Sequence, residues 1–273
     1  MIDLHLHTTA SDGTLAPAAL VARAASAGLT TISITDHDTF AGIAEARDAA
    51  TGLGLRLITG VEITAVEQHR DVHLLGYFVD PEDSGMAAFL AGQRADRLRR
   101  LREIADRLRA LGCPIDIEPL LARAAESPGR SVGRPLIADA LVSAGLAQDR
   151  NDAFDRLLGN DGPAYVPRTG ATPDDVIATV RKAGGLVSLA HPGVTRMDAI
   201  IPRLAGAGLA AIEVRHSDHD ADTEKRYREL AARHGLAVSG GSDFHGESAH
   251  RTGTLGALAL SADDFAALEA RRP

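Results

Sequence analysis

Tryptophan is absent from this sequence of 273 residues, and aromatic residues make up only 3% of it. Platforms that stack the bases of single-stranded nucleic acids need several aromatic side chains, so the composition limits that class of binding surface. Cysteine is scarce as well, because Cys113 is the only one. A single cysteine excludes an internal disulfide framework and a zinc ribbon, and it leaves His, Asp and Glu as the ligand set for a metal site.

An excess of positive charge is also missing, because the formal net charge is −8. A broad basic surface for duplex DNA is therefore not expected, although a local basic pocket for phosphate is compatible with this balance. No segment approaches the roughly 20 apolar residues of a membrane span, and no signal-peptide pattern is evident. We expect a cytoplasmic protein that binds neither duplex DNA nor membranes, and the sequence indicates no obligate protein partner.

Short apolar strands alternate with helical patterns over most of the chain. We predict strands at 30–35, 55–59, 72–79, 186–189, 210–214 and 236–239, and helices at 14–27, 39–50, 173–183, 197–207 and 221–234. Thr14 is the expected N-cap of the first helix. Strands that alternate with helices form parallel βα units, which favour a barrel or a doubly wound sheet. We prefer the barrel, because 273 residues are close to the length of one α/β barrel domain.

The alternation breaks between residues 84 and 163, where no strand is evident. The pattern there predicts a long arginine-rich helix at 93–111 and shorter helices at 117–125, 134–144 and 151–158. We interpret residues 93–163 as a helical insert domain, a substrate cap on a barrel formed by 1–92 and 164–273. The arginines of the long helix fit an ordinary solvated face, with one or two of them facing the site as the alternative; they are Arg94, Arg97, Arg99, Arg100 and Arg102.

The chain begins with two histidines two residues apart, His5 and His7, in an apolar stretch. On a strand this spacing places both rings on one face, which suggests a metal, whereas an isolated pair more often packs or faces solvent. Further polar residues lie at or just after the predicted carboxyl ends of strands, the end at which parallel α/β barrels build active sites. The set comprises His5, His7, Asp12, Asp36, His37, Glu62, His191, Asp243 and His245, with His73 near such an end.

Imidazoles and carboxylates in this number suit two or three divalent ions of Zn, Mn or Fe, because each ion takes about four to six ligands. Glu62 has two carboxylate oxygens, so it could bridge two ions. Paired ions about 3.5–4 Å apart can share a hydroxide that attacks phosphorus and can clamp a phosphate during displacement. This ligand set therefore points to phosphoester chemistry.

The motifs together resemble the PHP (polymerase and histidinol phosphatase) superfamily, in order and across the whole barrel. They are His5-x-His7, Ser11-Asp12-Gly13, Thr35-Asp36-His37, Gly60-Val61-Glu62, His73, Ala190-His191-Pro192 and Ser242-Asp243-x-His245. The resemblance implies a distorted (β/α)7 barrel with two or three metal ions.

The resemblance also implies three groups of metal ligands. They are His5, His7, Glu62 and Asp243 for one ion, Glu62, His73 and His191 for a second, and Asp12, His37 and His245 for a third. The alternative for His73, which lies within a strand, is a satisfied core histidine. Asp36 is left out of the ligands, because it is better placed to orient a ligand histidine through its ring N–H.

Two further segments, Gly133-Arg134-Pro135 and 164–168, look like the superfamily's bacterial nucleotide phosphatases and RNases. Members of that subgroup remove the 3′-phosphate of nucleoside 3′,5′-bisphosphates, release phosphate from AMP-like compounds, or trim short RNA from its 5′ end. The pattern often continues with a histidine, and here that position is Leu136, which weakens a catalytic role for this position.

Arg134 and Arg168 are the candidates for gripping phosphate oxygens, because a guanidinium offers a bidentate fork beside a Gly or Pro turn. His216 and His219 follow a predicted strand and could protonate the leaving alkoxide or contact the substrate. Surface arginines and solvated loop histidines are the respective alternatives. We therefore list Arg134, Arg168 and His216 as catalytic, and these three with His219 as substrate-binding.

The sequence thus predicts a metal-dependent phosphoesterase for small nucleotides, foremost nucleoside 3′,5′-bisphosphates or AMP-like compounds, with 5′–3′ exonuclease activity on short RNA as an extension. A histidinol-phosphate phosphatase is the alternative within the superfamily. A non-catalytic metal-binding module is the alternative of another class, and the complete ligand set argues against it.

Overall fold

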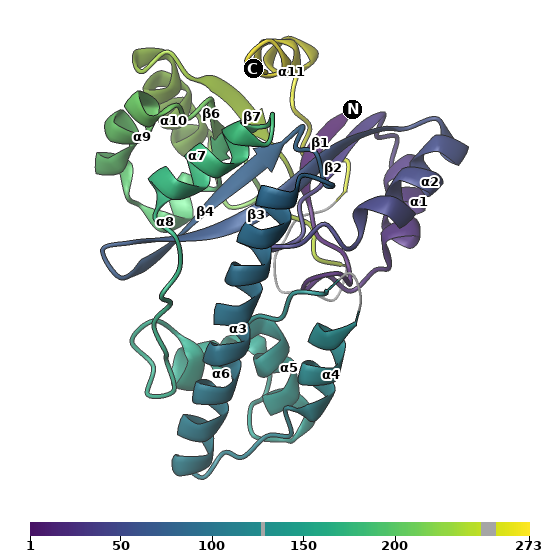
Figure 1. Ribbon diagram of the computed structural model, residues 1–273. Helices are drawn as coiled ribbons and strands as arrows, with labels where there is room; N and C mark the ends of the chain where they lie inside the picture. The colour runs from purple at the N-terminus through teal and green to yellow at the C-terminus, as the bar shows by residue number, and fades with distance from the viewer. Residues whose placement is uncertain (127–128, 247–254) are drawn as a thin grey trace.

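The structure, a computed structural model, describes residues 1–126, 129–246 and 255–273. Its centre is a sheet of seven strands in sequence order, curved into a nearly closed barrel (Figure 1). The strands are β1 (Ile2–Leu6), β2 (Thr31–Ile34), β3 (Arg56–Glu67), β4 (Arg70–Tyr77), β5 (Leu186–Leu189), β6 (Ala211–Arg215) and β7 (Ala237–Gly240). The predicted distorted α/β barrel is confirmed.

The chain after β7 approaches β1 at the seam of the barrel. His7 N–H donates to the carbonyl of Phe244 at 3.0 Å. A Cβ on Gly241 would lie 2.3 Å from the backbone nitrogen of His5, so the seam needs glycine at this position. The two ends of the sheet therefore meet beside the first predicted ligand, His5.

The prediction of parallel pairing throughout is wrong for β4, which runs antiparallel to both β3 and β5. Only Gln68 and His69 separate β3 from β4, and both have positive φ, 49° and 65°. A two-residue turn joins antiparallel strands, whereas a parallel pair needs a long crossover. The hairpin also extends β3 well beyond its predicted end, so Glu62 lies inside this strand instead of at its carboxyl end.

Helices cover the barrel on opposite sides in Figure 1: α1 and α2 on one, and α7, α9 and α10 on the other. Their bounds are α1 (Pro17–Ser26), α2 (Ile43–Leu53), α7 (Pro173–Lys182), α8 (Pro192–Thr195), η2 (Asp198–Ile200), α9 (Ile201–Ala207), α10 (Ala221–Arg233) and α11 (Ala262–Glu269). The N-cap of α1 is Ala16 and not Thr14, because Pro17 sets the first helical turn. Helix α11 was not predicted.

Between β4 and α7 the described chain is helical and forms a separate layer below the barrel (Figure 1). It comprises α3 (Ser84–Ala110), α4 (Glu118–Ala125), α5 (Arg134–Ser143), α6 (Arg150–Ala153) and the π-helix η1 (Phe154–Leu158). We call residues 84–158 the helical segment. It packs around its own apolar cluster, which includes Leu101, Ile104 and Leu141. Helix α3 begins at Ser84 instead of 93, because the Asp83 side chain caps it by accepting from Met86 N–H. The domain limits at 93 and 163 stay a prediction.

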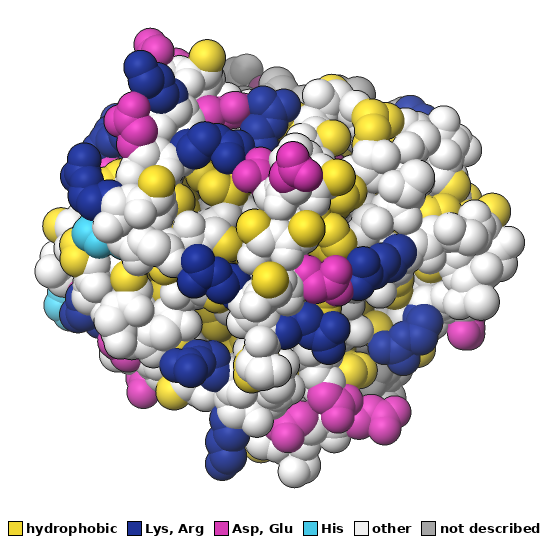
Figure 2. Space-filling view, turned by 90° about the horizontal axis from the view of Figure 1, so that it is seen from above, with side chains coloured by type: hydrophobic (Ala, Val, Ile, Leu, Met, Phe, Trp, Pro, Cys, Tyr) yellow, Lys and Arg dark blue, Asp and Glu magenta, His cyan; other side chains and the backbone are white. Residues whose placement is uncertain are grey.

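Arg97 and Arg100 of α3 are buried and line a cavity beside the predicted site, in agreement with the alternative that one or two of these arginines face the site. The other three, Arg94, Arg99 and Arg102, are at least partly exposed. The surface at the end of the molecule opposite the helical segment carries Lys and Arg side chains interspersed with Asp and Glu (Figure 2).

In the described ranges, no helix has both the length and the apolar character needed to cross a membrane.

Candidate active site

The barrel collects the predicted metal ligands at one end of its strands. His5 lies in β1 and His7 directly after it, His191 follows β5, and Asp243 follows β7. His191 and Asp243 have positive φ, 26° and 53°, which strains a non-glycine residue. Strained backbone at ligand positions indicates that the fold holds these side chains in a fixed direction.

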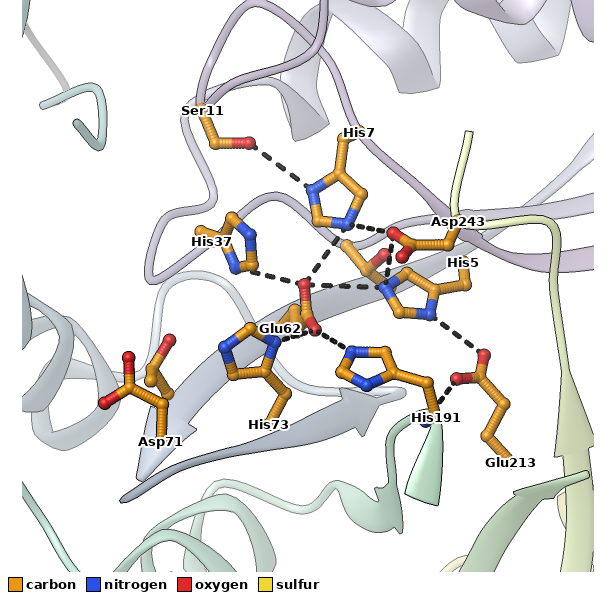
Figure 3. Close-up of polar contacts among 12 residues, drawn as sticks. His5, His7, Ser11, His37, Glu62, Asp71, His73, His191, Glu213 and Asp243 are labelled. Atoms are coloured by element: carbon orange, nitrogen blue, oxygen red, sulfur yellow. Dashed lines mark hydrogen bonds and ion pairs between the residues drawn. The ribbon is translucent and has the colours of Figure 1, made fainter. Parts of the chain in front are cut away.

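Glu62 lies at the centre of the histidines (Figure 3). Its Oε2 is 3.4 Å from His5 Nε2, 3.2 Å from His7 Nε2 and 3.0 Å from His37 Nδ1. Its Oε1 is 2.7 Å from His73 Nδ1 and 3.1 Å from His191 Nε2. The two oxygens of one carboxylate thus face two different sets of imidazoles, as the predicted bridging role requires.

A second carboxylate completes the first predicted group. Asp243 Oδ1 lies 3.3 Å from His5 Nε2 and 3.2 Å from His7 Nε2. The Nε2 atoms of His5 and His7 therefore both lie within 3.4 Å of a carboxylate oxygen of Glu62 and of Asp243.

The third predicted group surrounds Asp12. Its Oδ1 lies 3.4 Å from His245 Nε2, and its Oδ2 lies 3.7 Å from His37 Nε2. His37 thus presents one ring nitrogen to Asp12 and the other to Glu62, so it connects two of the predicted groups.

The carboxylates and imidazoles of the cluster are buried, and the charged form of each is stabilised by neighbours of opposite charge. Burial alone would raise the pKa of Glu62, but His37, His73 and His5 hold the pKa well below its usual value. Burial would lower the pKa of His7, but the adjacent carboxylates of Asp243 and Glu62 raise it to about 10. Buried carboxylates are stable only beside compensating positive charge, and divalent ions bound in the cluster would supply that charge.

Several ring nitrogens in the cluster are buried without a hydrogen bond in the described part of the chain, among them Nε2 of His5 and His7 and Nδ1 of His37 and His73. Four sets bring ligand atoms within 4.8 Å of one another: His7, Asp12, His37 and His245; His5, His7 and Asp243; His5, Glu213 and His216; and His37, Glu62 and His73. These ring nitrogens lie at ion-pair distance from Glu62 but lack a hydrogen bond of good geometry, which is costly for a buried polar atom, so the donor set fits divalent metal binding.

Asp36 does not contact a ligand histidine directly, contrary to the prediction. Its carboxylate accepts from Thr8 N–H and from the hydroxyls of Thr8 and Ser11. Ser11 Oγ in turn lies 3.5 Å from His7 Nδ1 (Figure 3). Asp36 therefore fixes the loop after β1 and reaches His7 only through Ser11.

Glu213 was not among the predicted residues, although it holds two of them. One oxygen accepts from His5 Nδ1 at 2.9 Å and the other from the backbone N–H of His191 at 2.7 Å. A carboxylate on the far ring nitrogen fixes the tautomer and direction of a metal-binding histidine. The available signal was an acidic residue within the otherwise apolar strand β6.

A cavity of about 350 Å³ opens beside the cluster. Its lining includes the predicted ligands Asp12, His37, His73 and His245 and the arginines Arg97, Arg100, Arg134, Arg150 and Arg168. Imidazoles and carboxylates on one wall and guanidiniums on another suit a phosphate ester that touches both.

Three of these arginines, Arg100, Arg134 and Arg168, face one carboxylate, Asp71, which lines the same cavity and was also not predicted. Arg134 Nη2 and Arg168 Nε lie 3.5 and 3.4 Å from Asp71 Oδ2. Burial, with the nearby Arg97 charge adding to it, lowers the pKa of Arg168 to about 9. Positive charge thus exceeds negative charge at this wall, which favours an anion.

His216 and His219 are buried and do not line the cavity. His216 Nδ1 accepts from Asp218 N–H, so its Nε2 donates to Asp243 Oδ2 at 3.3 Å. His219 Nδ1 donates to the Val214 carbonyl, and its Nε2 accepts from Gly193 N–H. Their predicted catalytic and substrate-binding roles stay predictions.

The fold and the ligand cluster describe a metal-binding barrel, and solved structures share its architecture. A candidate metal-dependent phosphoesterase from Bifidobacterium adolescentis superposes with a TM-score of 0.90 at 37% identity, covering 100% of this chain and 96% of that one.

The chain belongs to the PHP domain family, whose model matches residues 3–127. It is 34% identical to the 3′,5′-nucleoside bisphosphate phosphatase of Chromobacterium violaceum, over 89% of this chain and 87% of that protein. It is also 38% identical to the 5′–3′ exoribonuclease Rnm of Escherichia coli, over 89% of this chain and 84% of that protein.

Proposed function

We propose that this protein is a metal-dependent phosphoesterase that removes phosphate from small nucleotides, foremost nucleoside 3′,5′-bisphosphates. The cavity carries the proposal, because its lining joins metal-ligand candidates such as His37 and His73 to the guanidiniums of Arg134 and Arg168. The names of the relatives, a nucleoside bisphosphate phosphatase and an exoribonuclease, support this substrate class.

The proposed ligands for two or three ions of Mn, Zn or Fe are His5, His7, Asp12, His37, Glu62, His73, His191, Asp243 and His245. When bound, such ions lower the pKa of water and neutralise charge on the phosphate. Glu62 keeps the two sets of imidazoles together through its two oxygens. Glu213 fixes the ring of His5 and the backbone at His191.

Arg134 and Arg168 orient the substrate phosphate from the opposite wall. A guanidinium presents parallel N–H groups to two phosphate oxygens, which fixes direction as well as charge. Arg134 is held for this task by the carbonyl of Leu158 and the side chain of Asn160. The contact of His216 with Asp243 supports a positioning role, and its role as proton donor to the leaving alkoxide stays a prediction.

The experiment is phosphate release by the purified protein with Mn²⁺. The panel contains a nucleoside 3′,5′-bisphosphate, AMP, histidinol phosphate and a 5′-phosphorylated oligoribonucleotide. We expect the bisphosphate to have the highest kcat/KM and the short RNA to be shortened from its 5′ end. Turnover of histidinol phosphate alone would contradict the substrate and favour the histidinol phosphatase alternative.

A non-catalytic metal-binding module is the remaining alternative. It predicts bound metal without turnover of any phosphoester in the panel, so metal analysis and the same assay separate the two. An acidic chain with few aromatic residues suits a small substrate in the cytoplasm better than duplex DNA, and the proposal needs no protein partner.

A further inference from the structure

The three predicted ligand groups are anchored to different parts of the molecule. His5 and Glu62 lie within strands β1 and β3, and Glu213 of β6 holds His5. Asp12 and His37 instead lie in the loops after β1 and β2. Both loops are fastened by residues of the helical segment.

The loop of His37 is held by α3. Asp38, directly after His37, is fully buried, and its Oδ2 accepts from Arg97 Nε at 2.5 Å. The Asp38 carbonyl accepts from Arg94 Nη1 at 2.9 Å. Asp38 has a positive φ of 53°, so this turn is strained and depends on its contacts.

The loop of Asp12 is held by a second element, α4. Arg123 Nη2 donates to the carbonyls of Thr9 and Ser11 at 2.6 and 2.9 Å. Farther along the segment, Ser131 N–H donates to the carbonyl of Ala10 at 2.9 Å. These bonds reach the backbone on the amino-terminal side of Asp12.

We propose that the helical segment positions Asp12 and His37, two of the three predicted ligands of the third ion group, and that Arg97 and Arg123 are the positioning residues. This inference rests on the proposed metal centre. Occupancy of the third group then depends on how the segment is docked, whereas the ligands around His5 and Asp243 depend on the barrel. The segment thereby contributes to metal binding without supplying a ligand.

The test is Mn²⁺ binding, measured by calorimetry and by metal analysis after dialysis, on Arg123→Met and on the pair Asp38→Asn with Arg97→Met. The pair removes both buried charges together, so no unpaired charge remains. Arg97→Lys keeps the charge and serves as the conservative rescue. Arg109→Met is the matched control, because Arg109 is exposed at the far end of α3 and pairs with Asp106.

We expect one of the ions to bind at least tenfold less tightly in Arg123→Met and in the pair, with the other ions unchanged. Arg109→Met should match the unaltered protein, and Arg97→Lys should recover part of the loss. Folding is checked by circular dichroism. Folded variants that bind every ion as tightly as the unaltered protein would overturn the inference. If the unaltered protein itself bound no metal, the proposed function would fail instead.

Discussion

The cavity lies between two parts of the molecule that are built differently: the metal-ligand cluster, here called the first wall, and the arginine wall, here called the second. The cluster comes from the strands and from the loops that follow them, and its members contact one another through Glu62, Asp243 and Glu213. The arginine wall comes largely from helices, and Arg134 and Arg168 share Asp71 through long contacts. Rigid strand ends suit metal coordination, which tolerates little displacement, whereas phosphate binding needs charge and a fork that can adjust.

The largest expected effect comes from breaking the first wall. Replacing His5 and His7 together by alanine removes two nitrogens that face Glu62 and Asp243. Because metal ions contribute several kcal/mol to phosphoryl transfer, activity should fall by about 1,000-fold or more. Metal analysis should show ions lost in parallel. His69→Ala, an exposed histidine, is the control. Unchanged turnover in the double variant would refute the mechanism.

A smaller effect is expected from changing Glu213, which holds the ring of His5 in place. Glu213→Gln weakens the acceptor of His5 Nδ1 but keeps the shape of the side chain. Supporting carboxylates of this kind are worth about 10–100-fold in metal affinity. We expect Mn²⁺ affinity to fall within that range, measured by competition with a chelator. Glu224→Gln is the control, because Glu224 pairs with Arg215 at the same end of β6 without touching a predicted ligand.

Changes in the second wall should leave the metal in place. Arg134→Lys keeps a positive charge but loses the bidentate fork, which costs roughly 1.4 kcal/mol, or about tenfold. KM for the nucleotide should rise by about tenfold, with metal content unchanged. Arg156→Lys, on η1 and paired with Asp152, should behave as the unaltered protein. A loss of metal in Arg134→Lys would show that the two walls are not separable.

The same contrast explains what could be predicted from sequence. The ligand motifs lie at the ends of short apolar strands, where period-two patterning and barrel topology bring distant residues together. His5, Glu62 and Asp243 therefore meet as expected. Glu62 was nevertheless misplaced along its strand, because the turn at 68–69 has no Asn-Gly signal.

The arginine wall was harder to predict. An arginine on a long polar helix turns inward only if it finds acceptors, and those acceptors come from distant parts of the chain. Arg97 is buried because Asp38 and Thr64 accept its hydrogen bonds, and Arg100 because the carbonyl of Val166 does. Helical periodicity contains no information about these partners, so a solvated face was the natural prediction.

The smallest expected effect comes from Asp71 in the second wall, whose carboxylate contacts both Arg134 and Arg168. Burial would raise the pKa of Asp71, but Arg168, Arg100 and Arg134 hold it below its usual value, so this carboxylate is ionised at neutral pH. It therefore competes with a substrate phosphate for the same guanidiniums. Contacts of 3.4 and 3.5 Å are at the long end for a hydrogen bond, so a substrate phosphate can replace them.

Asp71→Asn should accordingly lower KM for the nucleotide by about two- to fivefold, because the arginines no longer share a negative charge. kcat and metal content should stay the same, since Asp71 is outside the predicted ligand groups. Initial rates over a range of substrate concentrations measure the split between KM and kcat. A rise in KM would mean that Asp71 orients the two guanidiniums for phosphate, and the second wall would then resemble the first in needing an internal carboxylate.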